Sequence, residues 1–102
     1  MINRVVLMGR LVANPELKTT TSGVKVTSFR IAVVRDYAKE GEERKADFID
    51  IVCWRQLAEF VVRYFTKGSL IVVDGKLQTR EKDNRKYIEV YADTVHFGGR
   101  ND

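Results

Sequence analysis

Most apolar segments of the chain alternate with polar residues at a period of two and are rich in β-branched residues, which is typical of strands. These segments span residues 3–12, 24–35, 47–54, 69–80 and 86–97. The exception is residues 55–67, where Leu57, Ala58, Val61, Val62 and Phe65 recur at spacings of three and four. This spacing predicts one helix, which Gly68 would end. The pattern therefore predicts three strands, a helix and two further strands.

The first strand segment has apolar residues on both of its faces. One face carries Val5, Leu7, the small Gly9 and Leu11, and the other carries Arg4, Val6, Met8 and Arg10. A strand that is apolar on both sides is usually covered twice, by its own core and by a second layer. We expect the second layer to be another subunit, so Val6 and Met8 are candidate oligomer contacts.

The apolar phase of the second segment changes along its length. Val24 and Val26 share a parity that Phe29, Ile31 and Val33 do not. Because a slip of one residue turns a strand over, this change predicts a β-bulge near residues 27–28, which would also bend the strand as a small barrel requires.

The third segment has one aliphatic and one aromatic face. Ile49, Ile51 and Cys53 form the first face, and Phe48, Asp50, Val52 and Trp54 form the second. A carboxylate in the middle of the second face indicates that the two aromatic rings stand on a surface that water or a ligand reaches. Large exposed aromatic side chains are typical of a base-stacking platform or of a subunit interface. The residues alone leave both interpretations open.

The last two segments form a hairpin in this interpretation. Ile71, Val73 and Leu77 are expected inside, Asp83 and Asn84 lie at the centre of the predicted turn, and Ile88, Val90 and Ala92 alternate with Tyr87, Glu89 and Tyr91. The charged residues 38–46, around Gly41, are interpreted as a solvated hairpin tip, and the alternative is a flexible arm that guides a ligand.

Composition and residue counts limit the classes of protein to which this chain can belong. The 102 residues carry 18 Lys and Arg against 14 Asp and Glu, a modest excess that favours a polyanionic partner. No apolar run approaches the length of a membrane span, and no secretion signal is visible, so we expect a soluble cytoplasmic protein. Cys53 and His96 are the only Cys and His residues, too few for a zinc site. Cys53 is expected to be a buried, inert thiol and His96 to be incidental, so no enzyme, metal or cofactor is predicted.

Five strands with one helix after the third describe an all-β fold, the five-stranded Greek-key barrel of the OB class, with its helix between strands three and four. In that barrel, oligonucleotides bind to strands two and three. We expect one domain over residues 1–97, and residues 98–102 are expected to begin a flexible tail.

Several strings resemble the bacterial-type single-stranded DNA-binding protein family, SSB, over essentially residues 1–97. They are NRVVLMGRL and NPEL at the N-terminus, then FRIAV, ADFI, WRQLAE, KGSL and DGKLQTR, in the family order. The resemblance implies an OB-fold protomer that assembles into a homotetramer and wraps single-stranded DNA. It also implies partnership with replication and repair proteins, which the family recruits through an acidic C-terminal tip that these 102 residues do not include.

The resemblance also implies roles for single residues. Tyr37, Phe48 and Trp54 match stacking aromatics, and a fourth aromatic of the family is replaced by Lys82, where a phosphate contact is expected instead. The candidate phosphate contacts are Arg4, Arg10, Arg30, Arg55, Lys67, Lys76, Arg80 and Lys82. For each of these eight, the alternative is a merely solvated side chain.

The alternative from another class is an OB-fold adaptor of the primosomal type, which works mainly by docking replication proteins. It would show weak DNA binding and tight protein partners. An enzymatic OB protein would need a second domain that 102 residues do not accommodate.

Overall fold

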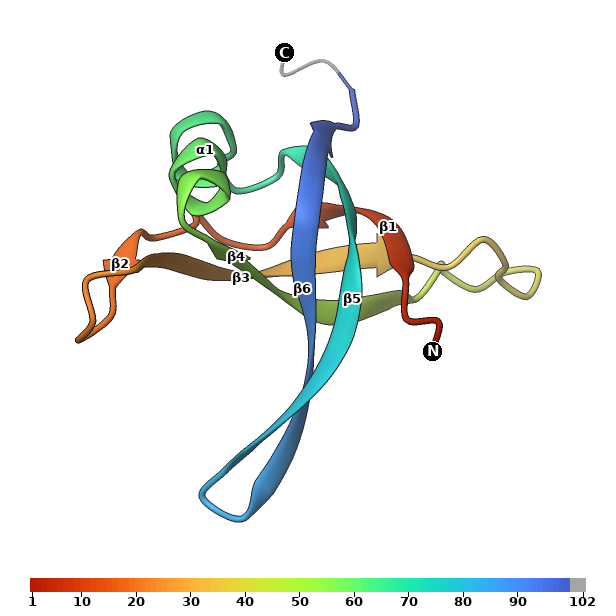
Figure 1. Cartoon of the computed structure of the whole chain (residues 1–102). Helices are drawn as coiled ribbons and strands as arrows, with labels where there is room; N and C mark the ends of the chain where they lie inside the picture. Colours follow the sequence, from red (N-terminus) through yellow and green to blue (C-terminus); the bar gives the residue numbers. More distant parts are fainter. Residues whose placement is uncertain (100–102) are drawn as a thin grey trace.

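The five alternating segments all form strands in the computed structural model, which describes residues 1–99 (Figure 1). The elements are β1 (Val5–Leu11), β2 (Lys18–Thr19), β3 (Lys25–Val34), β4 (Ala46–Trp54), α1 (Gln56–Tyr64), β5 (Leu70–Lys82) and β6 (Arg85–Phe97). The sheet order is β1-β5-β6-β4-β3, and β3 also pairs with β1, so that five strands form a closed ring. The predicted barrel, with one helix between its third and fourth long strands, is confirmed; β2 is a short addition on the edge of β3.

Two glycines let the strands approach one another where the ring closes. Residue pairs from Val5 with Gly75 to Arg10 with Leu70 join β1 to β5, and Leu11 at the end of β1 pairs with Ile31 of β3. A Cβ atom at Gly9 would lie 2.7 Å from the carbonyl oxygen of Ala32, and one at Gly75 would overlap the carbonyl of Tyr91. Only glycine fits at these two positions.

The core fills the barrel and extends under α1, which covers one end of it (Figure 1). Its fully buried side chains include Ile31, Ile51, Ile71 and Val90 from the strands, with Val61 from the helix. The alternation in the sequence therefore predicted the inner faces of β1 and β4, of β3 from Phe29 onward, and of the first half of β5.

The helix is shorter than the sequence predicts. It spans Gln56–Tyr64 rather than residues 55–67, because Phe65 is already extended at φ −119° and donates its N–H to the carbonyl of Val61. Gly68, at φ 88°, does not end the helix. It lies in the following loop and donates its N–H to the carbonyl of Leu11.

The predicted bulge at residues 27–28 is wrong. The pairing of β3 with β4 runs without a shift from Val26 opposite Trp54 to Val34 opposite Ala46. The core phase continues through Thr27, which is fully buried, and its hydroxyl is the one buried side-chain polar atom without a hydrogen-bond partner among residues 1–99. The apolar phase changes because a threonine takes a core position. The register shift lies instead in the pairing of β5 with β6, where Asp74 and Gly75 lie opposite Thr94 and Ala92 and β6 carries the extra residue.

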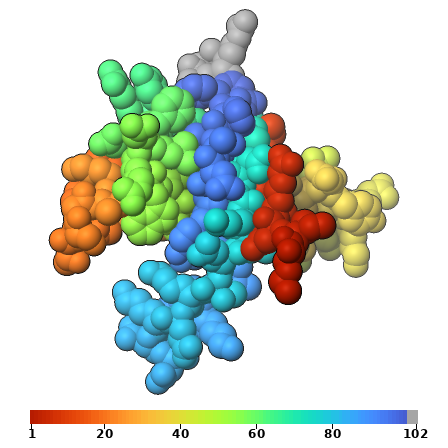
Figure 2. Space-filling model, in the orientation of Figure 1, coloured from red at the N-terminus to blue at the C-terminus, as the bar shows by residue number. Residues whose placement is uncertain are grey.

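Beyond this shift, the β5–β6 hairpin projects from the body of the molecule (Figure 2). Leu77 and Ile88 are 45% and 65% exposed, so the prediction that they face the core is wrong. The reason is that the strands are longer than the barrel, so their outer halves have no second layer to cover them. Asp83 and Asn84, at φ 53° and 62°, form the tight turn that the sequence predicts.

The end of β6 is attached to the start of β5. The N–H of Gly98 donates to the carbonyl of Leu70, so the last strand stays attached through this residue, and residues 100–102 of the expected tail lie outside the described residues. Within residues 1–99, no helix combines the length and the apolar composition that crossing a bilayer requires.

Candidate nucleic-acid interface

The aromatic side chains of β4 stand on the outer surface of the barrel. Phe48 is 62% exposed and Trp54 is 38% exposed, as the carboxylate between them predicts. Val52, on the same side of the strand, is buried and pairs with Tyr91 of the parallel strand β6. The exposed part of this face therefore consists of two separate rings with a polar segment around Asp50 between them.

Strand β3 supplies the other half of this surface. Its residues Val26, Ser28, Arg30 and Ala32 lie opposite Trp54, Val52, Asp50 and Phe48 of β4, respectively. We call these eight residues the aromatic face. Arg30 lies directly across from Asp50, so the face carries one cation and one anion at its centre.

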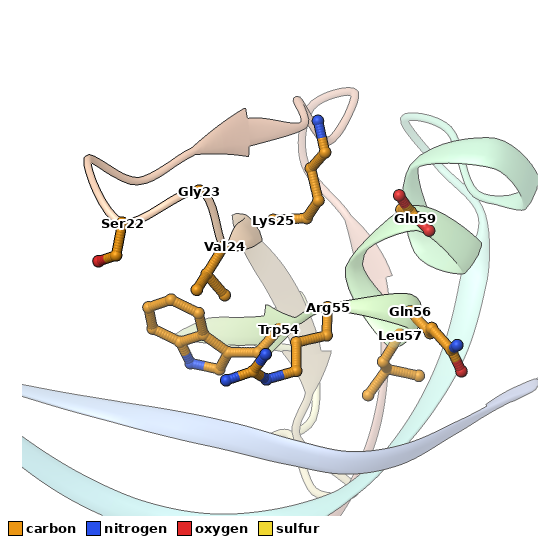
Figure 3. A pocket seen from close by; sticks show the side chains of 9 residues that line it. All are labelled: Ser22, Gly23, Val24, Lys25, Trp54, Arg55, Gln56, Leu57 and Glu59. Atoms are coloured by element: carbon orange, nitrogen blue, oxygen red, sulfur yellow. The ribbon is translucent and has the colours of Figure 1, made fainter.

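A hollow of about 680 Å³ lies beside Trp54 (Figure 3). The turn from β2 to β3, including Ser22 and Lys25, forms one side of it, and the start of α1 forms the other. Arg55 and Trp54 both line this hollow (Figure 3). Aromatic and cationic groups together at an open hollow can receive a flat ring that carries an anionic substituent.

The backbone of Arg55 is unusual for a residue with a side chain. Its φ of 61° and ψ of −129° lie in a region where glycine is favoured. Hydrogen bonds hold it there: its N–H donates to the carbonyl of Lys25 at 2.7 Å, and its carbonyl accepts from the N–H of Glu59. The junction between β4 and α1 thus keeps Arg55 next to Trp54 in spite of the strain.

Three of the eight candidate phosphate contacts are already ion-paired. Arg4 pairs with Asp74 at 2.6 Å, Arg30 with Asp50 at 2.9 Å and Arg80 with Glu89 at 3.3 Å. Hydrogen bonding to the carboxylates, reinforced by their charge, raises the pKa of Arg4 and Arg30.

The other five candidates are differently placed. Arg10 donates to the carbonyl of Gly68 at 2.9 Å. Across residues 1–99, no carboxylate lies within ion-pair distance of Arg10, Arg55, Lys67, Lys76 or Lys82. None of these five cations is neutralised by a carboxylate of the described residues, so each can attract an added anion, although Arg10 would have to share its bond to Gly68.

The remaining candidates are spread over the surface. Tyr37 is 78% exposed, on the loop after β3 rather than on the aromatic face itself. Val6 and Met8 are 58% and 51% exposed on the outer side of β1. The structure thus brings Phe48, Trp54, Arg30 and Arg55 close to the β3–β4 surface and leaves the other predicted contacts on separate elements.

The lone Cys and His residues have no visible chemistry. Cys53 is fully buried, and burial raises the pKa of its thiol to about 12, as expected for an inert side chain. His96 is exposed on β6, opposite Val72. Among residues 1–99, no three His, Cys, Asp or Glu side chains are grouped so that they could hold a metal ion.

Sequence reasoning missed three features of this surface. They are the cross-strand pairing of Arg30 with Asp50, the partnership of Arg80 with the buried Glu89, and the contribution of Ser22 and Lys25 to the hollow beside Trp54. Alternation within one strand gives the face of a residue but not its neighbour on the next strand. Only the pairing register could have revealed these contacts.

Comparison with known proteins agrees with this geometry. The model of the Single-strand binding protein family matches residues 2–98. "Single-stranded DNA-binding protein 1" of Staphylococcus aureus strain MSSA476 is 49% identical over 95% of the chain, and the proteins named "Single-stranded DNA-binding protein" of Halalkalibacterium halodurans and Bacillus cereus share the same identity and coverage. The chain spans 65%, 61% and 60% of the lengths of these three relatives, respectively. The protein therefore belongs to the single-strand binding protein family.

Proposed function

We propose that this protein binds and protects single-stranded DNA, without sequence preference and without catalysis, during DNA replication, recombination and repair. The observation that carries the proposal is the pair of exposed rings, Phe48 and Trp54, on the β3–β4 surface of an OB barrel whose family members are named for this activity. Stacking on such rings contributes about 1–3 kcal/mol per base and tolerates any sequence, because every base has a π face.

Cations of the surface supply the second part of the mechanism. Arg55 lines the hollow beside Trp54, and Lys67, Lys76 and Lys82 are further unpaired cations of the described chain. Contacts from such groups to phosphates release counterions, so affinity should fall steeply with salt. Tyr37, exposed on its loop, is proposed as a third stacking residue.

Titration with a long dT oligonucleotide at low and high salt, followed by the emission of Trp54, tests the proposal. Trp54 is the sole tryptophan, so the signal reports on the aromatic face. We expect saturable quenching, with a midpoint that moves to higher DNA concentration as salt rises. Phe48→Ala should weaken binding, whereas Tyr64→Leu, a change of an exposed aromatic on α1, should not.

Two results would contradict the proposal in different ways. Binding seen by a second method without any change in emission would move the DNA away from Trp54. Absence of binding to dT by the folded protein would instead favour the protein-docking adaptor.

We also propose that the subunits assemble into a homotetramer in which the outer side of β1 is a contact. Val6 and Met8 are apolar, more than half exposed, and lie on the strand that pairs with β5 at Asp74 and Val72. Light scattering at micromolar concentration should give the mass of four chains, and Met8→Glu should reduce it. A stable monomer, or a tetramer unaffected by Met8→Glu, would contradict this contact.

The proposal also includes the cellular location of the protein. A protein that covers single-stranded DNA in a bacterium works in the cytoplasm, in association with the nucleoid, and shares its substrate with replication and repair proteins. Fluorescence microscopy of a tagged chain should therefore show foci on the nucleoid that increase after DNA damage. A uniform cellular distribution under both conditions would contradict it.

A further inference from the structure

The aromatic face carries a negative charge at the place where a polyanion is proposed to bind. Asp50 is two residues from Phe48 and four from Trp54 along β4, so all three side chains point to the same side of the strand. It accepts a hydrogen bond from Nε of Arg30 at 2.9 Å, and the side chains of Arg30 and Asp50 are 55% and 36% exposed. The ion pair is therefore accessible from solvent.

Asp50 also separates two hollows of the surface. One hollow, of about 330 Å³, is lined by Arg30, Phe29 and Asn14 among others, and the other, of about 310 Å³, by Phe48 and Ile88 among others. Asp50 lines both. A DNA strand that occupies both hollows therefore contacts Asp50 at each of them.

A phosphate that reaches Arg30 meets this carboxylate in one of two arrangements. It displaces Asp50, which breaks the ion pair, or it binds the outer nitrogens of the guanidinium while Asp50 stays on Nε. The second arrangement places two anions on one cation. Both arrangements cost free energy that an uncharged residue at position 50 would not impose.

We propose that Asp50 limits the affinity of the aromatic face for single-stranded DNA, as an internal competitor for Arg30. This inference rests on the proposed function and specifies how strongly the site binds. Asp50 is a positioning residue for Arg30: it holds the guanidinium in place in the free protein and reduces the net positive charge that the backbone of the DNA meets. The face thereby binds its ligand less tightly, and releases it more readily, than its rings and cations alone would allow.

The test measures dT binding by Trp54 emission over a series of salt concentrations for four proteins. Asp50→Asn keeps the shape of the side chain and removes its charge, and Asp50→Ser is a second uncharged variant. Asp47→Asn is the matched control, because Asp47 forms an ion pair of the same kind with Arg35 at 2.8 Å but has the parity of Ile49 along β4, opposite to that of Phe48. All three variants raise the formal net charge equally.

Both Asp50 variants should bind about fivefold more tightly than the unmodified protein at low salt, the size expected for an exposed ion pair. The plot of log affinity against log salt should become steeper by about 0.7, which corresponds to one additional neutralised phosphate of a single strand. Asp47→Asn should change both values much less.

The outcomes distinguish this inference from the proposed function. If the unmodified protein binds dT and the Asp50 variants bind equally or more weakly, or with an unchanged salt slope, the competitor role of Asp50 is overturned and DNA binding stands. An equal gain in Asp47→Asn would likewise overturn it, since net charge alone would then explain the effect. If none of the four folded proteins binds dT, the proposed function fails and the inference fails with it.

Discussion

The rings of Phe65 and Phe97 stack with their centroids 4.8 Å apart and their planes inclined by 17°. Phe65 directly follows α1, and Phe97 is the last residue of β6, so this contact joins the helix to the end of the final strand. Phe60 of the helix lies 5.9 Å from Phe97 between ring centroids, which extends the cluster. The aromatic cluster thus fixes the helix over its end of the barrel.

Removal of Phe65 should therefore cost much more stability than removal of Phe97. Phe65 is 1% exposed and Phe97 is 50% exposed. We expect Phe65→Ala to lower the free energy of unfolding by about 3–5 kcal/mol, because it leaves a cavity in the core. Phe97→Ala should cost about 1 kcal/mol, since half of its surface already meets solvent. Urea unfolding of both variants checks the order, and equal losses would contradict it.

Gly75 should not tolerate even a methyl group. A Cβ atom there would overlap the carbonyl of Tyr91 on the paired strand, at the register shift between β5 and β6. We expect Gly75→Ala to lower the free energy of unfolding by about 1–3 kcal/mol, as overpacking does. Gly99→Ala is the control, because its Cβ would lie 3.6 Å from the Leu70 side chain, an ordinary contact. Similar unfolding midpoints for the two variants would show that the backbone moves aside at Gly75.

Arg55 should show opposite effects on stability and on binding. Its φ of 61° is strained for a residue with a side chain, so Arg55→Gly should raise the free energy of unfolding by about 1 kcal/mol. The same change removes the guanidinium from the hollow beside Trp54 and should weaken dT binding. Asn84→Gly, at a φ of 62° on the hairpin turn, is the control for backbone relief and should leave affinity nearly unchanged. If Arg55→Gly raised both the free energy of unfolding and the affinity for dT, Arg55 would not be part of the binding surface.

The ion pair of Asp47 with Arg35 should contribute to stability above the acid range only. Hydrogen bonding from Arg35 holds the pKa of Asp47 below its ordinary value of 3.8. A lowered pKa in the folded state favours the charged form, so the stabilisation is complete above that ordinary value and is lost as pH falls through the lower folded value. Urea midpoints between pH 6 and about pH 2 should fall less steeply for Asp47→Asn than for the unmodified protein. Parallel curves would contradict this assignment.

Cys53 should react with alkylating reagents only when the protein opens. Burial raises the pKa of its thiol to about 12, so the thiolate that reacts is scarce in the folded state at pH 8. We expect labelling by iodoacetamide at pH 8 to be slow in buffer and to accelerate with unfolding in urea. Mass spectrometry measures the extent of labelling over time. Fast labelling in buffer would indicate local opening of β4.

Alternation in the sequence predicted all five long strands to within two residues at each end, and it predicted the exposed rings of β4. Alternation failed at positions where the polarity of a residue does not match its burial. Thr27 takes a core position that the pattern assigns to an apolar residue, and the pattern was therefore interpreted as a bulge. Leu77 and Ile88 continue the apolar phase after the barrel has ended. Neither case can be recognised from the sequence of one strand, because all five strands together determine which positions the barrel buries.

The candidate site was predictable in its residue types and less so in its electrostatics. The family resemblance pointed to Trp54, and Arg30 was a candidate phosphate contact by its residue type, but no property of a single segment shows that Arg30 faces Asp50. The side chain of Glu89 is another example, since it lies in a strand predicted to be half exposed and is nevertheless 7% exposed beside Arg80. Such partners depend on register, which becomes known only when the ring of strands is closed.

The pairing of β1 with β5 has a consequence for folding during synthesis on the ribosome. Gly9 and Arg10 of β1 pair with Ile71 and Leu70 of β5. These pairs can form only after about 60 further residues have been synthesised, so β1 must wait for β5. At the synthesis rates of about 5–20 residues per second typical of cells, that wait lasts roughly 3–12 s. During it, β1 has only its short pairing with β3, and Leu7 lacks the part of the core that β5 supplies. The barrel therefore closes only after β5 and β6 have been synthesised, and slow synthesis would prolong the exposure of the incomplete barrel to aggregation.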